Sequence, residues 1–239
     1  MSHSMTEHMT EHMTERATEQ ATEKLAAMAA AWVVDEGMEY GAAKRKAARQ
    51  QPGRPELPSN EQVEDAVREH IALFCAGTQA QELQALREVA LLWMRRLQDF
   101  RPHLSGAAWR GTATQRSAVH IDLYCDDIKA AEIALINTGV PFDVGSEPGT
   151  GREPLTILTL ASRSRALRDP VTVHLLLHDA DDLRGALKPD TRGRNWRGSL
   201  AALEKLLAAP GAEGPNGLTG LMGLTGLLGL TGGPAGGAT

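Results

Sequence analysis

Residues 118–125 combine three chemically different polar side chains with a regular apolar pattern. The polar positions are His120, Asp122 and Tyr124, and the apolar positions between them are Val119, Ile121, Leu123 and Cys125. A period of two residues is typical of a β-strand that buries one face. An imidazole and a carboxylate on the same face can transfer protons or bind a divalent metal ion. The alternative is an ordinary polar sheet face.

A second segment, residues 171–178, repeats this pattern. Its apolar positions are Val171, Val173, Leu175 and Leu177, and its polar positions include Thr172, His174 and His178. If both strands turn their apolar faces to one core, His120, Asp122 and His174 lie together on the other face. We therefore expect these three residues to form a metal or acid–base site, provided that the two strands are neighbours in the sheet.

A glycine turn precedes the first of these strands. Gly106-Ala107 is followed by twelve residues, which include Arg110-Gly111-Thr112-Ala113, and then by His120-Ile121-Asp122-Leu123. Over about residues 100–180 this arrangement resembles the nucleotidyltransferase superfamily. In that family a Gly-Ser or Gly-Gly turn after a strand precedes an Asp-x-Asp or Asp-x-Glu motif on the next strand. The order of the surrounding helices is also similar.

The resemblance implies metal-assisted transfer of a nucleotidyl group from a nucleoside triphosphate, with Mg²⁺ or Mn²⁺ as the cofactor. It implies catalysis by Asp122 and metal binding by His120, Asp122 and His174. Nucleotide binding is implied for four residues of the turn and the stretch after it, Gly106, Ala107, Arg110 and Thr112.

Three positions depart from the family's pattern. Ala107 lacks the hydroxyl of a Gly-Ser turn, and His120 and His174 replace the first and third metal carboxylates. Because Mg²⁺ prefers oxygen ligands, two imidazoles would weaken the usual site. We therefore expect a catalytically degenerate domain that binds a nucleotide or a protein partner. A softer metal, Mn²⁺ or Zn²⁺, is one alternative. The other is that carboxylates come from elsewhere, from Asp126, Asp127, Asp179, Asp181 or Asp182.

Apolar residues recur at helical spacing before residue 100. The first stripe consists of Leu25, Met28, Ala29, Trp32 and Val33. Ser59-Asn60 is expected to begin a helix that runs to about residue 76, with inward residues Val63, Val67, Ile71 and Phe74. A longer helix over 79–100 has on its buried side Leu83, Leu86, Ala90, Trp93 and Leu97. We expect these last two helices to pack as an antiparallel pair.

From residue 104 the periodicity becomes that of strands. Strands are expected at 104–110, 118–125, 155–161 and 171–178, and helices at 128–138 and 199–208. Helices followed by a strand-rich half indicate an α+β fold. The resemblance further implies a mixed sheet with nucleotidyltransferase-like topology. We expect the charged segment 179–197 to be a solvated loop, with phosphate binding by its arginines as the alternative.

A basic helix is expected over residues 38–50, with its positive charges at Lys44, Arg45, Lys46 and Arg49. Together with the helix before Gly37 it could contact DNA, so a DNA-binding regulatory protein is an alternative function. The prolines that follow interrupt the next helix that such an element needs, which makes DNA the less favoured partner. A resemblance to UDP-N-acetylmuramate–alanine ligase lacks support, because no Gly-Lys-Thr or Gly-Lys-Ser phosphate loop occurs.

Composition sets further bounds. Of the 239 residues, 42% are hydrophobic and 4% are aromatic, so the core should consist of Leu, Ala and Val. The net charge of −5 argues against a surface devoted to nucleic acid or anionic membrane. Cys75 and Cys125 have no C-x-x-C partners, so we expect reduced thiols. We find neither a signal peptide nor a membrane span in the sequence and expect a cytoplasmic protein.

Repeats mark both ends of the chain. Residues 5–24 are a tetrapeptide repeat built on Thr-Glu, and the C-terminal segment repeats Gly-Leu-Thr. We expect a repeat-rich tail at 1–24, a helical region at 25–100, a nucleotidyltransferase-like region at 101–209 and a disordered tail at 210–239.

Overall fold

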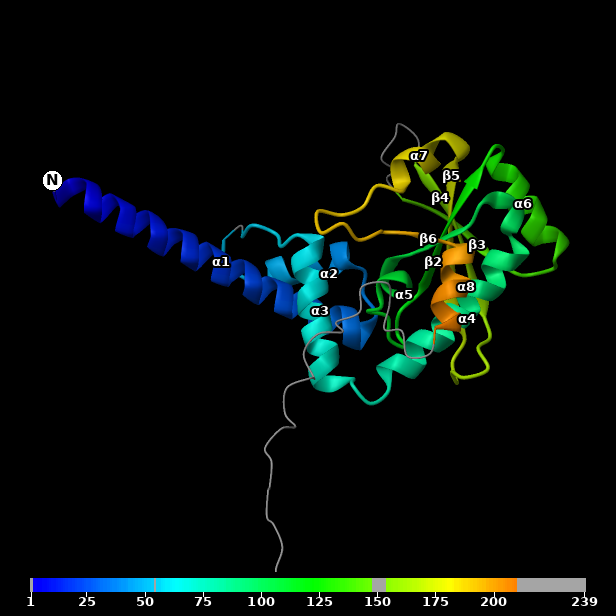
Figure 1. Ribbon diagram of the computed structural model, residues 1–239, viewed down its shortest axis with the longest axis horizontal. Coiled ribbons are helices and arrows are strands. Elements are labelled where there is room, and N and C mark those ends of the chain that lie inside the picture. The colour runs from blue at the N-terminus through cyan, green and yellow to red at the C-terminus, as the bar shows by residue number, and fades with distance from the viewer. Residues whose placement is uncertain (1, 54, 148–153, 210–239) are drawn as a thin grey trace, which may run out of the picture.

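The computed structural model describes residues 2–53, 55–147 and 154–209 (Figure 1). The helices are α1 (Ser2–Glu36), α2 (Tyr40–Arg49), α3 (Asn60–Phe74), α4 (Gln79–Arg96), α5 (Gly106–Arg110), α6 (Ile128–Asn137), α7 (Leu183–Ala186) and α8 (Leu200–Ala208). The strands are β1 (His103–Ser105), β2 (Val119–Cys125), β3 (Asp143–Glu147), β4 (Leu155–Ser162), β5 (Val171–Asp179) and β6 (Gly198–Ser199). The C-terminal tail expected at 210–239 lies outside the described residues.

The strands form one mixed sheet in the order β3-β4-β5-β2-β1-β6. The central neighbours β2 and β5 are parallel, with His120 opposite His174 and Tyr124 opposite His178. The remaining neighbours are antiparallel. The expected α+β class is thereby confirmed, and the two strands with polar alternation lie side by side.

The chain builds two apolar cores. One lies between α1, α2 and α3 and includes Leu25, Ala29, Val33, Val63 and Val67. The other lies between the apolar face of the sheet and the helices α4, α6 and α8. The helices expected over 25–100 are therefore shared between the two cores, because α4 packs on the sheet. The N-terminal part of α1, which contains the tetrapeptide repeat, projects away from both cores (Figure 1).

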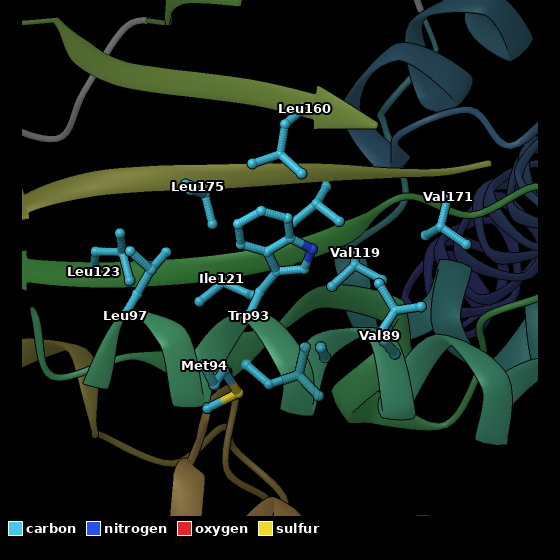
Figure 2. Packing of buried hydrophobic residues seen from close by; sticks show 14 of the residues in the cluster. Val89, Trp93, Met94, Leu97, Val119, Ile121, Leu123, Leu160, Val171 and Leu175 are labelled. Atoms are coloured by element: carbon cyan, nitrogen blue, oxygen red, sulfur yellow. The ribbon is translucent and has the colours of Figure 1, made fainter. Parts of the chain in front are cut away.

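Trp93 is the largest contribution of α4 to the sheet core. Its indole points from the helix onto the strands and lies among Val119, Ile121 and Leu175 (Figure 2). The side chain is 3% exposed, so nearly all of its area is removed from water. This packing fixes the apolar face of β2 and thereby turns the polar positions of that strand to the opposite face.

The turn after β1 corrects one predicted strand. A strand was expected over 104–110, but β1 ends at Ser105 and a helix, α5, begins at Gly106. Gly106 has a φ of +64°, a left-handed conformation that interrupts a strand and that glycine adopts without steric cost. Ala107 and Ala108 then favour the helix. Gly106 makes the expected turn, but a helix rather than a strand follows it.

Two predictions about the helices are wrong. The expected antiparallel pair does not form, because α3 packs mainly on α1, whereas α4 packs on β2 and α8. Phe74, expected to point inward, is 72% exposed, since the buried stripe of α3 ends before its last turn. Strand β3 was not predicted, because its sequence, with Asp, Gly and Glu, has low strand propensity. It forms by pairing with β4.

The other expected elements are found within a few residues of their predicted ends. Ser59 caps α3 as predicted, in a reciprocal pair of hydrogen bonds with Gln62. In the described part of the chain, no helix combines the length and the apolar character needed to cross a bilayer.

Candidate functional site

Side chains from α3 and α4 hold the turn that contains α5. Arg87 Nε donates to the carbonyl of Ala108 at 2.9 Å, and Arg68 Nη2 donates to the carbonyl of Arg110 at 2.6 Å. Gln79 donates to two further carbonyls, those of Gly111 and Ala113. Carbonyls at the end of the short helix and in the residues after it thus have side-chain donors, which fixes the position of α5.

A pocket of about 370 Å³ lies between this turn and the N-terminal helices. From α5 and β2 it is lined by Gly106, Ala107, Arg110 and His120, and from the preceding loop by Ser117 and Ala118. The N-terminal helices contribute Val33, Tyr40, Asn60 and Glu64, the connection between α1 and α2 contributes Met38 and Glu39, and the segment before β6 contributes Trp196. Its volume lies at the lower end of the range for small-molecule sites.

Buried ion pairs form the floor of this pocket. Arg110 is 3% exposed and pairs with Glu64 of α3 and with Asp190, whose carboxylate lies 3.0 Å from Arg110 Nη2. Arg194 joins the same two carboxylates at 3.1 Å and 3.0 Å. The segment 187–197 is therefore tied to α3 and α5. Three arginines of the segment expected to be a solvated loop are instead paired with carboxylates, namely Arg192, Arg194 and Arg197, whereas Arg184 is exposed as expected.

One nitrogen of the Arg110 guanidinium has no hydrogen-bond partner in the described part of the chain. Its Nε and Nη2 bind carboxylates, whereas its Nη1 is buried and has no hydrogen-bond partner among the described residues. Trp196 lies over the guanidinium, 4.4 Å from ring centroid to Cζ. Leaving a buried charged donor unpaired costs free energy.

His120 and His174 are neighbours on the polar face of the sheet, as their alternation predicted. Their ring centroids lie 5.1 Å apart, and His120 Nε2 is 3.4 Å from the Glu39 carboxylate. The Nδ1 of His174 lies 2.9 Å from the hydroxyl of Thr159. Burial, and then the neighbouring charge of His120, hold the pKa of His174 below its ordinary value. His174 is therefore predominantly neutral at pH 7.

Asp122 lies on the same face but engages other partners. It is 1% exposed; His178 Nε2 donates to one carboxylate oxygen at 2.7 Å, and Arg197 Nε donates to the other at 3.1 Å. Burial opposes ionisation of Asp122, but the His178 hydrogen bond and the Arg197 charge outweigh it and hold its pKa below the ordinary carboxyl value. Asp122 is thus ionised, and each of its oxygens already accepts a hydrogen bond.

Some of the residues selected from the sequence therefore line the pocket, and others do not. Gly106, Ala107, Arg110 and His120 line the pocket, whereas Asp122 and His174 do not line it, and Thr112 is buried behind the turn. In the described ranges, no three His, Cys, Asp or Glu side chains are grouped so that they could hold a metal ion. Two of the basic residues considered for DNA contact are engaged within the protein: Lys46 pairs with Glu36, and Lys44 donates to Asn60.

The sequence reasoning missed Glu64, Tyr40 and Trp196. Glu64 lies beside Val63 and Val67 in a helix whose stripe indicated only packing, and the burial of a charge there depends on a partner 46 residues away. Burial raises the pKa of Tyr40 to about 12, so its phenol is neutral at pH 7. For Trp196, the closest indication in the sequence was the large number of arginines in the surrounding segment.

Gly37, between α1 and α2, lines the pocket and lies close to the loop that contains Arg116. It has a φ of +69°, and a Cβ at this position would collide with the backbone carbonyl of Arg116. We expect Gly37→Ala to lower the free energy of unfolding by about 2–3 kcal/mol, of which ~1 kcal/mol is due to the left-handed conformation and the rest to displacement of the loop. Urea denaturation measures this change.

Gly139→Ala is the matched control. Gly139 has a φ of +68° but open space around its Cα, so the conformational cost of about 1 kcal/mol remains without the collision. Equal losses for the two variants would contradict the close approach of Gly37 to Arg116.

Neither a family model nor a curated protein matches this chain.

Proposed function

We propose that this protein is a catalytically degenerate nucleotidyltransferase-like domain that binds a nucleotide in the pocket beside Gly106. The pocket carries the proposal: it gathers the Gly106-Ala107 turn, Arg110 and His120, which the sequence resemblance alone had connected. The sheet supports it, because the turn follows one strand, β1, and leads to the next, β2, which has a parallel neighbour, β5. Arg110 brings a positive charge to the pocket lining, and such a charge attracts a phosphate group.

The partners of Asp122 support the loss of catalysis. In the mechanism that the resemblance implies, this carboxylate would hold the metal ion, yet both of its oxygens accept hydrogen bonds from His178 and Arg197. A metal ion would have to displace a half-buried guanidinium that lies 3.1 Å away, at the cost of leaving that charge without its carboxylate partner. We therefore propose binding of a nucleotide without nucleotidyl transfer, and we favour no protein or DNA partner.

The test is an equilibrium titration of the full chain with adenine and cytosine nucleotides in the presence of Mg²⁺ or Mn²⁺. We expect wild type and Asp122→Asn to bind alike, because Asp122 does not line the pocket. Trp196→Ala removes one wall and the contact with Arg110, and we expect it to weaken binding at least about tenfold. A thermal unfolding scan confirms that each variant is folded.

Two outcomes would refute the proposal. One is that no nucleotide binds under any metal condition. The other is nucleotidyl transfer by wild type that Asp122→Asn abolishes, which would show that the carboxylate remains catalytic.

A further inference from the structure

We infer that the pocket selects nucleotides with a single phosphate over nucleoside triphosphates. This inference rests on the proposed nucleotide binding and names the class of ligand. The side chains that line the pocket carry little positive charge. Among the described residues around the pocket, Arg110 is the sole arginine or lysine, whereas Glu39 and Glu64 are both carboxylates.

Most of the positive charge of Arg110 is already compensated. Three guanidinium groups meet two carboxylates in the buried cluster, which leaves one net positive charge; its members are Arg68, Arg110, Arg194, Glu64 and Asp190. A phosphate monoester carries a charge of about −1.5 to −2 at neutral pH. One net positive charge beside the pocket therefore compensates the charge of one phosphate group at most.

The rim of the pocket opposes additional negative charge. Glu39 lines the pocket, is 67% exposed and lies 3.4 Å from His120. A second and third phosphate would therefore meet a carboxylate without gaining another cation from the lining. Like charges that share a pocket repel even where the site is partly solvated.

A divalent ion ordinarily offsets the charge of a triphosphate. The carboxylate that the resemblance assigns to that ion is Asp122, and its two oxygens are held by His178 and Arg197 away from the pocket lining. The side chains that line the pocket, rather than a bound metal ion, therefore determine which ligand charge binds best. They favour the nucleotide with the smallest number of phosphates.

Isothermal titration calorimetry on the full chain tests this inference with AMP, CMP, ATP, CTP and inorganic phosphate, each with and without Mg²⁺. We expect the better monophosphate to bind at least about tenfold more tightly than its triphosphate. Equal or tighter binding of the triphosphate with Mg²⁺ would overturn this inference and leave the proposed function standing. Absence of binding by every nucleotide would refute both. Inorganic phosphate that binds as tightly as AMP would show that the pocket recognises no nucleoside, which also overturns the inference.

The variant Glu39→Gln isolates the contribution of the rim. Glu39 is exposed, so we expect no change in folding, and we expect the preference for the monophosphate to shrink several-fold as triphosphate affinity rises. Glu88→Gln removes the same charge from α4, on the opposite face of the sheet, and should leave the preference unchanged. An unchanged preference in Glu39→Gln would contradict the charge argument.

Discussion

Replacing Glu64 by alanine is expected to lower the free energy of unfolding by about 3–5 kcal/mol. Glu64 is 1% exposed and accepts hydrogen bonds from Arg68, Arg110 and Arg194. Its removal leaves three guanidinium groups against the single carboxylate of Asp190. Two of these groups, on Arg110 and Arg194, are also buried or nearly so. An uncompensated buried charge costs far more than the loss of the pair's own attraction.

Asp65→Ala is the control, at the next position of the same helix. Asp65 pairs with Arg192 through two hydrogen bonds, but their side chains are 43% and 46% exposed. Water screens such a pair, so we expect a loss of no more than about 1 kcal/mol. Chemical denaturation of both variants measures the difference. Similar losses at the two positions would show that the Glu64 cluster is solvated rather than buried.

Trp93→Ala is expected to destabilise the protein by about 3–5 kcal/mol. The indole nitrogen of Trp93 has no hydrogen-bond partner in the described residues, so the loss is one of packing rather than of a polar contact. Removing the ring opens a cavity between α4 and the strands β2 and β5, where Val119, Ile121 and Leu175 lie around it (Figure 2). Urea denaturation followed by circular dichroism measures the change.

Leu92 provides the comparison for Trp93. It precedes Trp93 in α4 but is 41% exposed, so Leu92→Ala should cost less than about 1 kcal/mol. If the two alanine variants differed by less than about 1 kcal/mol, Trp93 would not occupy the centre of the core.

The strands of the sheet were predictable where one face is apolar. The alternation in β2 and β5 predicted both elements and the common face of His120, Asp122 and His174, because a buried face leaves a period of two in the sequence. Strands β3 and β6 carry no such period. β3 is exposed along its whole length, and β6 has two residues, so pairing with a neighbouring strand rather than local sequence forms them.

The candidate site was predictable in part for a related reason. Gly106 and Arg110 were found through the spacing of a turn and a strand, which is a local property of the chain. The partners of Asp122 were not found, because the strand pattern does not show that Arg197, 75 positions later, returns to its carboxylate. Glu64 was missed for the same reason. Long-range ion pairs leave no periodic signal, and here they decide which carboxylates remain available for a ligand.

Hydrogen–deuterium exchange of the full chain, with and without a saturating nucleotide, tests most directly whether the pocket beside Gly106 is the binding site. We predict slower exchange on binding in residues 37–41, in 106–111 and around Trp196, which lie in three separate parts of the chain and all contribute to the lining of this pocket. Protection confined to residues outside the pocket, such as the β4–β5 loop at 163–170, or no change in exchange at a saturating concentration, would contradict the account.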